Sequence, residues 1–153
     1  MNIYDYIKSH ILVLDGATGT MIQRYNLGED DFRGELYTNH PVNLNGCNDL
    51  LCITKPEIMK EIHLSYLRAG ANIIETNSFN ANRVSMADYA LEEQCYTINK
   101  AAAAIAKEAA TEFFASNPEH PAWVAGSMGP TNRSASISPD IQNPGARNIS
   151  FDD

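Results

Sequence analysis

The sequence lacks several features that would place it in a common class of protein. No stretch approaches the roughly 18 consecutive apolar residues of a membrane span, and the first residues do not have the basic and then apolar layout of a signal peptide. Lys and Arg are few, 11 against 19 Asp and Glu, and they do not cluster. Because a nucleic-acid surface needs clustered basic residues, the net charge of −8 argues against one. We therefore expect neither a membrane nor a nucleic acid as a partner.

Cysteine is also scarce. Cys47, Cys52 and Cys95 are an odd number with no paired framework, which favours free thiols in a reducing compartment. We therefore expect a cytoplasmic protein. The chain has 153 residues, the length of one ordinary domain. It is 44% hydrophobic and 20% charged, which suits a globular domain with a core of its own.

What the sequence does contain is a repeated pattern, in which a short apolar run ends in a loop of small polar residues. The first run, 11–14, is continuously apolar, as expected of a strand covered on both faces, and Asp15 and Gly16 end it. The three predicted strands and the loops that follow them are residues 11–15 and 15–20, 72–75 and 76–80, and 122–125 and 126–131.

Helical patterns separate these strands. Thr54 and Glu57 have the spacing of a capping box, Pro56 suits a first helical turn, and Gly70 is placed to end the helix. Polar and irregular sequence predicts loops over 26–48 and 132–153. The predicted helices cover residues 2–10, 20–25, the stretch between Thr54 and Gly70, 83–89 and 91–114.

Strands that alternate with helices are expected to be parallel and joined by right-handed crossovers. In such sheets the loops after the carboxyl ends of the strands carry the chemistry, so the three polar loops are predicted to share one site. In the first loop, Gly16 and Gly19 allow a tight turn that exposes backbone N–H groups, and Thr18 and Thr20 are placed to cap a helix that starts near Met21. An anion could bind these N–H groups, with a cation beside Asp15.

Three segments of the chain are distinctive: LDGATGTMIQ, NGCNDLLCITKPEIMKEIHLSYLRAGANIIETNSFNAN and VAGSMGPTNR. They resemble the N-terminal part of the homocysteine S-methyltransferase family, and within it the homocysteine-binding module of the cobalamin-dependent methionine synthases. The resemblance covers Leu12 to Asp153. It implies a (β/α)8 barrel, of which residues 1–153 would hold about three strands and two full crossovers, so we expect a barrel that is incomplete at its C-terminus.

The resemblance also implies a reaction. In this family zinc binds homocysteine as a thiolate, which attacks a methyl group. In the methionine synthases the methyl comes from methylcobalamin, which is recharged from methyltetrahydrofolate on other modules of a longer chain. By resemblance, Asp15 would face the ammonium group of homocysteine. The backbone of Gly16, Ala17, Thr18, Gly19 and Thr20 would hold its carboxylate, and Thr76, Asn77 and Ser127 would line the same mouth.

The sequence departs from the family at the metal. The family's three zinc cysteines lie in later strands, two of them adjacent, and no adjacent pair occurs here. Cys47, Cys52 and His63 do not have the spacing of a usual structural zinc site, so we expect free thiols and a surface or edge histidine. We therefore expect no zinc, no cobalamin and no catalytic residue in these residues, and little activity of the chain alone. Its partners would be homocysteine, the remaining barrel half with the cobalamin and folate modules, and other copies that pair with its open sheet.

A non-catalytic fragment or a small-molecule-binding α/β module is the alternative, with DGATGT holding a phosphate. However, GATGT lacks the lysine of a phosphate-binding P-loop, and the dinucleotide spacing of glycines is not met. The residues also have simpler explanations. The Asp15 turn could only cap a helix, and Thr76 and Asn77 could only satisfy backbone groups at a strand end.

Overall fold

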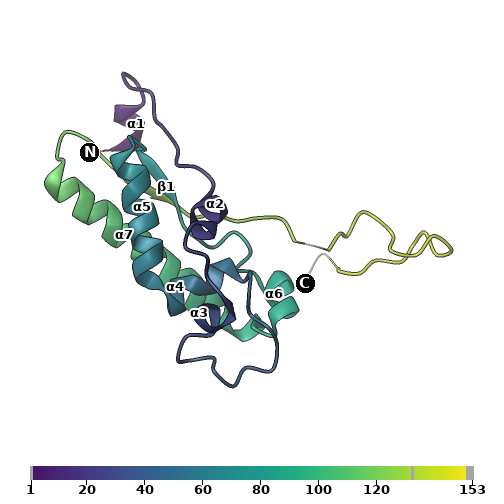
Figure 1. Cartoon of the computed structure of the whole chain (residues 1–153). Coiled ribbons are helices and arrows are strands. Elements are labelled where there is room, and N and C mark those ends of the chain that lie inside the picture. Colours follow the sequence, from purple (N-terminus) through teal and green to yellow (C-terminus); the bar gives the residue numbers. More distant parts are fainter. Residues whose placement is uncertain (1, 132, 151–153) are drawn as a thin grey trace.

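The computed structural model describes residues 2–131 and 133–150 (Figure 1). Two short parallel strands, β1 (Ile73–Glu75) and β2 (Trp123–Ala125), pair with Ile74 opposite Val124. A single parallel bridge from Leu14 to Ile73 adds the first predicted strand on the other side of β1. The predicted parallel order of the three strands is therefore confirmed.

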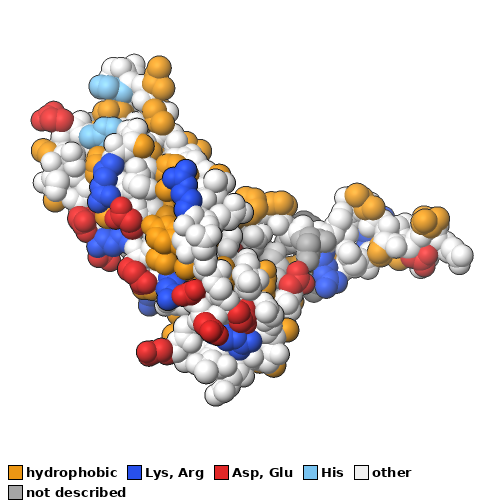
Figure 2. Space-filling view, in the orientation of Figure 1, with side chains coloured by type: hydrophobic (Ala, Val, Ile, Leu, Met, Phe, Trp, Pro, Cys, Tyr) orange, Lys and Arg blue, Asp and Glu red, His pale blue; other side chains and the backbone are white. Residues whose placement is uncertain are grey.

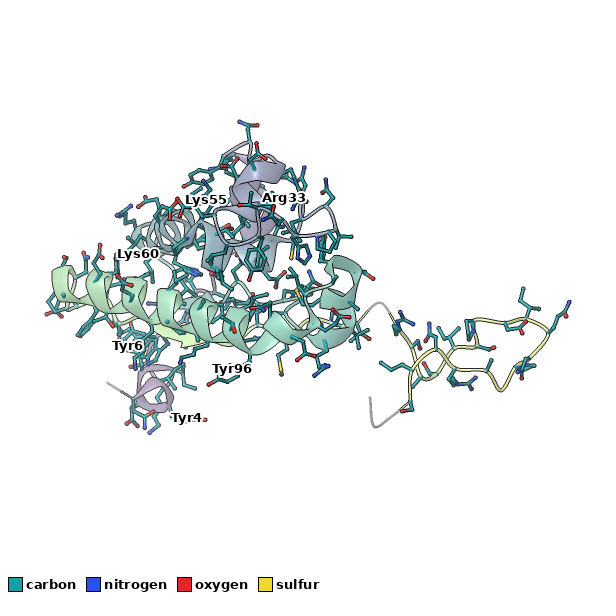
Figure 3. The ribbon with its side chains drawn as sticks, turned by 90° about the horizontal axis from the view of Figure 1, so that it is seen from below. Tyr4, Tyr6, Arg33, Lys55, Lys60 and Tyr96 are labelled. Atoms are coloured by element: carbon teal, nitrogen blue, oxygen red, sulfur yellow. The ribbon has the colours of Figure 1, made fainter. Side chains whose placement is uncertain are left out.

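Two helices, α5 (Pro56–Arg68) and α7 (Cys95–Ser116), pack against each other and against this sheet (Figure 1). The apolar stripe predicted for 91–114 is buried at Ile98, Ala102 and Phe113. Lys60 reaches from α5 to Glu108 and Glu112 of α7 and ties the outer surfaces of the two helices together (Figure 3). None of the helices in the described residues is long and apolar enough to cross a membrane.

The first strand differs from its prediction. Only Leu14 forms a bridge, and Ile11 and Val13 are 89% and 50% exposed. The prediction that this run is covered on both faces is therefore wrong for these residues. The helices α5 and α7 cover the sheet on the side of Ile74, which is fully buried, whereas the packing described on the opposite face is that of Tyr6 against Trp123.

Several helix boundaries also differ. The helix α2 (Thr18–Gln23) begins three residues before Met21, and its N-cap is Ala17, so the predicted capping by Thr18 and Thr20 is wrong. The predicted capping box of Thr54 is wrong too, because Thr54 ends the short helix α4 (Leu51–Thr54) and its hydroxyl donates to the carbonyl of Leu50. Gly70 ends α5 with a φ of +106°, as predicted.

The predicted helix over residues 2–10 is shorter than expected, since α1 covers only Ile3–Tyr6. It lies against the sheet through the ring of Tyr6, whose centroid is 5.3 Å from that of Trp123. The predicted helical segment over 83–89 is confirmed as α6 (Arg83–Met86) followed by the 3-10 helix Ala87–Tyr89. A further 3-10 turn, Glu92–Gln94, leads into α7.

The polar stretch 26–48 is ordered and contains an unpredicted helix, α3 (Glu29–Arg33). The Arg33 guanidinium donates to the carbonyl groups of Tyr37, His40 and Val42, and Glu29 accepts from the backbone N–H of Leu44 (Figure 3). Arg33 and Glu29 also form an ion pair 2.6 Å long, so these two side chains together hold much of this loop. Sequence periodicity could not reveal it because the contacts are not between helix faces.

Residues 133–150 form an arm that extends away from the body, irregular as predicted (Figure 1). Its two limbs are joined by Arg147, which donates to the carbonyl of Ala135. Apolar side chains lie on its surface, among them Ile141, which is 98% exposed (Figure 2). Residue 132 and residues 151–153 of the predicted loop lie outside the described residues.

Candidate functional site

A cavity of about 550 Å³ opens where the strands end. Its wall combines the loops after all three strands with the turn around Asn48, so the loops predicted to share a site do lie together. Eight of the nine predicted site residues line the cavity, and their roles in binding stay a prediction. Thr20 is the exception, because it is exposed on α2 and does not line the cavity. The lining residues are Asp15, Gly16, Ala17, Thr18, Gly19, Asn48, Asp49, Glu75, Thr76, Asn77, Phe79, Asn80 and Ser127.

Asp15 has the least satisfied side chain of this wall. Its Oδ2 accepts the backbone N–H of Glu75 at 3.0 Å, whereas its Oδ1 is buried and has no hydrogen-bond partner among the described residues. Burial raises the pKa of this carboxyl to about 6, the Glu75 N–H opposes that shift, and the negative charge of Glu75 adds to it. Oδ1 of Asp15 is therefore an acceptor that a hydrogen-bond donor on a ligand could satisfy.

The turn after Asp15 presents backbone donors. None of the N–H groups of residues 16–20 donates to an acceptor within the described part of the chain. A Cβ on Gly16 would lie 3.2 Å from the hydroxyl oxygen of Tyr66, which is a tight contact, and that hydroxyl donates to the carbonyl of Ala17. The turn is thus packed on α5 from behind while its N–H groups remain available.

The loop after β1 uses its polar groups internally. The Thr76 hydroxyl lies 2.7 Å from that of Ser78 and accepts the backbone N–H of Ser127 at 2.9 Å. The Ser78 hydroxyl lies 3.0 Å from the carbonyl oxygen of Ser127, to which it donates. The Asn77 side-chain NH2 donates to the carbonyl of Asn48 at 2.7 Å. Thr76 and Asn77 therefore join neighbouring loops, which agrees with the simpler explanation considered for them.

Glycine allows the second and third loops to touch. A Cβ on Gly129 would lie 2.5 Å from ring atoms of Phe79, and the Gly129 N–H donates to the Phe79 carbonyl at 2.8 Å. Beyond this contact lies a second cavity of about 380 Å³, which shares Asp49, Phe79 and Asn80 with the first. Phe79 thus stands between two compartments.

Sequence reasoning did not name Asn48, Asp49, Glu75, Phe79 or Asn80 as site residues, although Phe79 and Asn80 belong to the predicted loop 76–80. Phe79 and Asn80 follow a predicted strand, so their position alone could have identified them. Asn48 and Asp49 come from the 3-10 helix Asn48–Leu50 and precede a helix rather than follow a strand. No local pattern marks them as part of the site.

The residues considered for zinc do not form a site. Burial raises the pKa of Cys47 and of Cys52 to about 12, which keeps both thiols protonated. The prediction that His63 is a surface or edge residue is wrong, since it is 1% exposed, and burial lowers its pKa to about 4. In residues 2–131 and 133–150 no three His, Cys, Asp or Glu side chains lie close enough together to hold a metal ion.

Comparison with known proteins connects this geometry to a family. The sequence profile described as "Homocysteine S-methyltransferase" matches residues 12–153. The chain is also similar to two structures of the homocysteine methyltransferase MmuM from Escherichia coli. The metallated form is 27% identical over 82% of this chain and 40% of that chain, with a TM-score of 0.64. The oxidized form is 28% identical over 81% and 39%, also with a TM-score of 0.64.

The chain thus spans about two fifths of the length of these structures. The likeness covers about four fifths of this chain, so the predicted α/β fold with parallel strands, part of a (β/α)8 barrel, is confirmed.

Proposed function

This chain belongs to the homocysteine S-methyltransferase family, and we propose that the larger of its two cavities binds homocysteine for methyl transfer to the sulfur. Homocysteine carries an ammonium group, a carboxylate and a thiol, and methylation of the sulfur gives methionine. The cavity offers groups that complement the first two. The family supports the class of reaction, and the cavity supports the binding of an amino acid.

The buried, unpartnered Oδ1 of Asp15 is the observation that carries this proposal. An ammonium group would supply the missing donor and would offset the unfavourable burial that raises the pKa of Asp15. Glu75 lines the same cavity and adds a second negative charge. A phosphate would meet both carboxylates at close range, which is why we favour an amino acid over the phosphate-binding alternative.

The carboxylate of homocysteine would accept from the N–H groups of Gly16 to Gly19, which line the cavity. Thr76, Asn77 and Ser127 would contribute the shape of the opposite wall, because their hydrogen bonds join the second and third loops. In this arrangement the substrate contacts the turn 15–20, whose polar groups are unpaired in the described residues, and the loops 76–80 and 126–131, which are hydrogen-bonded to each other.

For the methyl donor we propose methylcobalamin, recharged from methyltetrahydrofolate, as in the cobalamin-dependent methionine synthases. The three segments quoted from the sequence support this branch of the family. Zinc, when bound, lowers the pKa of the homocysteine thiol so that the thiolate is present at neutral pH. No three His, Cys, Asp or Glu side chains of the described residues lie close enough together to hold zinc, so we propose that zinc and cobalamin are bound by polypeptide outside these 153 residues.

A polypeptide that completes the barrel is the partner that suits the open sheet. The backbone groups of Val13 and Asp15 pair with β1, whereas those of Leu12 and Leu14 have no hydrogen-bond partner in the described residues. Other copies of the chain could occupy this edge instead. We expect the chain alone to associate as its concentration rises, and a monodisperse monomer in small-angle scattering with a cooperative melt would contradict that. Three free thiols support a cytoplasmic location.

Calorimetry on the chain with L-homocysteine and with ATP tests the binding proposal. We expect homocysteine to bind and ATP not to bind. The matched ligand is 4-mercaptobutanoate, which keeps the thiol and carboxylate but lacks the ammonium group, and it should bind more weakly than homocysteine. Binding of ATP without any response to homocysteine would overturn the proposal in favour of a phosphate-binding module.

A further inference from the structure

The loop after β1 is attached to a segment some thirty residues earlier in the chain. The backbone N–H of Asn80 donates to Oδ1 of Asp49 at 2.9 Å, and the side chain of Asn77 donates to the carbonyl of Asn48 at 2.7 Å. The thiol of Cys52 donates to the carbonyl of Asn77 at 3.4 Å. The loop is therefore held at both ends by the turn Asn48–Leu50 and the helix that follows it, in addition to the sheet.

Asp49 has the one buried acidic side chain in the described residues, with 3% of its surface exposed. Burial raises the pKa of this carboxyl, and hydrogen bonds from the backbone N–H groups of Asn80 and Ala81 oppose the shift. The titratable groups whose pKa values its charge affects are Cys47, Cys52 and Tyr89. All three are neutral at neutral pH, so the backbone N–H groups of the loop compensate for the burial of this carboxylate.

Asp49 also lies on the wall that the two cavities share, together with Phe79 and Asn80. It is thus bonded to the segment that carries the other two residues of that wall. Removal of its acceptor oxygens would leave the N–H group of Asn80 unpaired, whereas that of Ala81 would keep the carbonyl of Ser78, and the loop would have to move for the Asn80 N–H to reach water. Asp15 would not move with it, since Asp15 is bonded to the backbone of Glu75.

We propose that Asp49 is a positioning residue for homocysteine binding: its carboxylate fixes the loop 77–80, so that Phe79 and Asn80 line the same cavity as Asp15. The inference rests on the proposed function, because it assigns a role within the same cavity. Asp49 lies outside the strand-end loops, so the proposal adds a residue from another part of the chain to those that shape the cavity.

Two substitutions at this position separate the acceptor from the volume it fills. Asp49→Leu keeps the size of the side chain and removes both oxygens, and we expect it to weaken homocysteine binding by about tenfold or more. Asp49→Asn keeps an acceptor for the Asn80 N–H and should restore the affinity to within about threefold of wild type. Calorimetry under reducing conditions measures both.

The matched control is Asp31→Leu. The Asp31 carboxylate also accepts a backbone N–H, that of Gly28 at 3.0 Å, and pairs with Lys55, but it does not line either cavity. We expect this variant to lower the melting temperature without changing the affinity for homocysteine. A fall in affinity equal to that of Asp49→Leu would show that any loss of stability weakens binding, and would overturn the inference.

A measurement without ligand covers the case in which Asp49→Leu does not fold. In an amide NMR spectrum of the wild-type chain, the Asn80 N–H signal should shift as Asp49 takes up a proton, and this titration should disappear in Asp49→Asn. An Asn80 signal that titrates identically in both proteins would overturn the inference. Failure of the wild-type chain to bind homocysteine would overturn the proposed function, whereas binding that a folded Asp49→Leu leaves unchanged would overturn this inference alone.

Discussion

The first and second strand-end loops line one cavity and differ in how their polar groups are hydrogen-bonded. The turn 15–20 leaves a carboxylate oxygen and the N–H groups of residues 16–20 without hydrogen-bond partners among residues 2–131 and 133–150. In the loop 76–80, the hydroxyls of Thr76 and Ser78 form hydrogen bonds with the backbone of Ser127, and the side-chain NH2 of Asn77 donates to the carbonyl of Asn48. The two loops have similar small polar compositions, so composition alone does not tell a binding group from a structural one.

The difference shows that unused hydrogen-bonding capacity, rather than residue type, marks the side of a cavity that recognises a ligand. Unpaired buried polar atoms are rare in folded proteins and cost free energy, and because Asp15 lines a cavity, a ligand there can satisfy its Oδ1. The satisfied loop defines where the ligand can lie. Each of the substitutions considered below alters one loop and leaves the other intact.

Asp15→Ala should have the largest effect on binding. Loss of a charge-assisted hydrogen bond costs about 1.5–3 kcal/mol, which corresponds to a fall in homocysteine affinity of roughly 10- to 150-fold. The affinity for 4-mercaptobutanoate, which has no ammonium group, should change little. Calorimetry with both ligands measures the difference, and equal losses for the two would contradict the contact between Asp15 and the ammonium.

The pH dependence of binding should follow the same carboxyl. Because folding raises the pKa of Asp15 from 3.8 to about 6, homocysteine affinity should fall by up to tenfold per unit as the pH drops below about 6. The raised pKa also means that ionised Asp15 destabilises the fold as the pH rises through 3.8 to about 6. Asp15→Asn should therefore flatten the binding profile and raise the melting temperature at pH 7. A wild-type profile that is flat from pH 5 to 7 would argue against this role.

Local sequence patterns were sufficient to predict the elements that depend on one helix face or one short apolar run. The stripe of α7, the strands β1 and β2 and the end of α5 at Gly70 all agree with the structure. The run 11–14 was mispredicted because its burial depends on what covers the sheet, which the run itself does not encode. His63 was mispredicted because its residue type was given more weight than its position, four residues from the buried Met59 and Leu67.

The candidate site was predictable to the extent that it follows strands. The order strand, loop, helix brought eight predicted residues to one cavity. Asp49 and Asn48 were not predictable this way, because the turn that carries them reaches the cavity through the fold of the loop 26–48. That loop is held by Arg33 and Glu29, whose contacts join backbone groups rather than side-chain stripes.

Thr76→Val tests the satisfied loop. Valine keeps the shape of the side chain but removes the acceptor of the Ser127 N–H, so we expect a loss of about 1–3 kcal/mol in the free energy of unfolding. Homocysteine affinity should change less than in Asp15→Ala. The control is Thr111→Val on the exposed side of α7, where the hydroxyl donates to the Lys107 carbonyl, and it should stay within about 0.5 kcal/mol of wild type. Denaturant unfolding compares the two variants. Equal losses would show that the hydrogen bond from the Ser127 N–H to Thr76 contributes no more to the free energy of unfolding than an exposed hydroxyl on a helix does.

Thr20→Val should have the smallest effect on homocysteine affinity. It tests whether the ligand-binding part of the first loop ends before Thr20. Thr20 belongs to the predicted substrate-binding turn, yet it is exposed on α2 and does not line the cavity. Its substitution removes only a hydroxyl that has no hydrogen-bond partner in the described residues, so affinity and stability should both stay within experimental error, about 0.5 kcal/mol. If calorimetry instead showed a loss comparable with that of Asp15→Ala, the ligand would extend along α2. The contrast between an open first loop and a satisfied second loop would then have to include the helix as well.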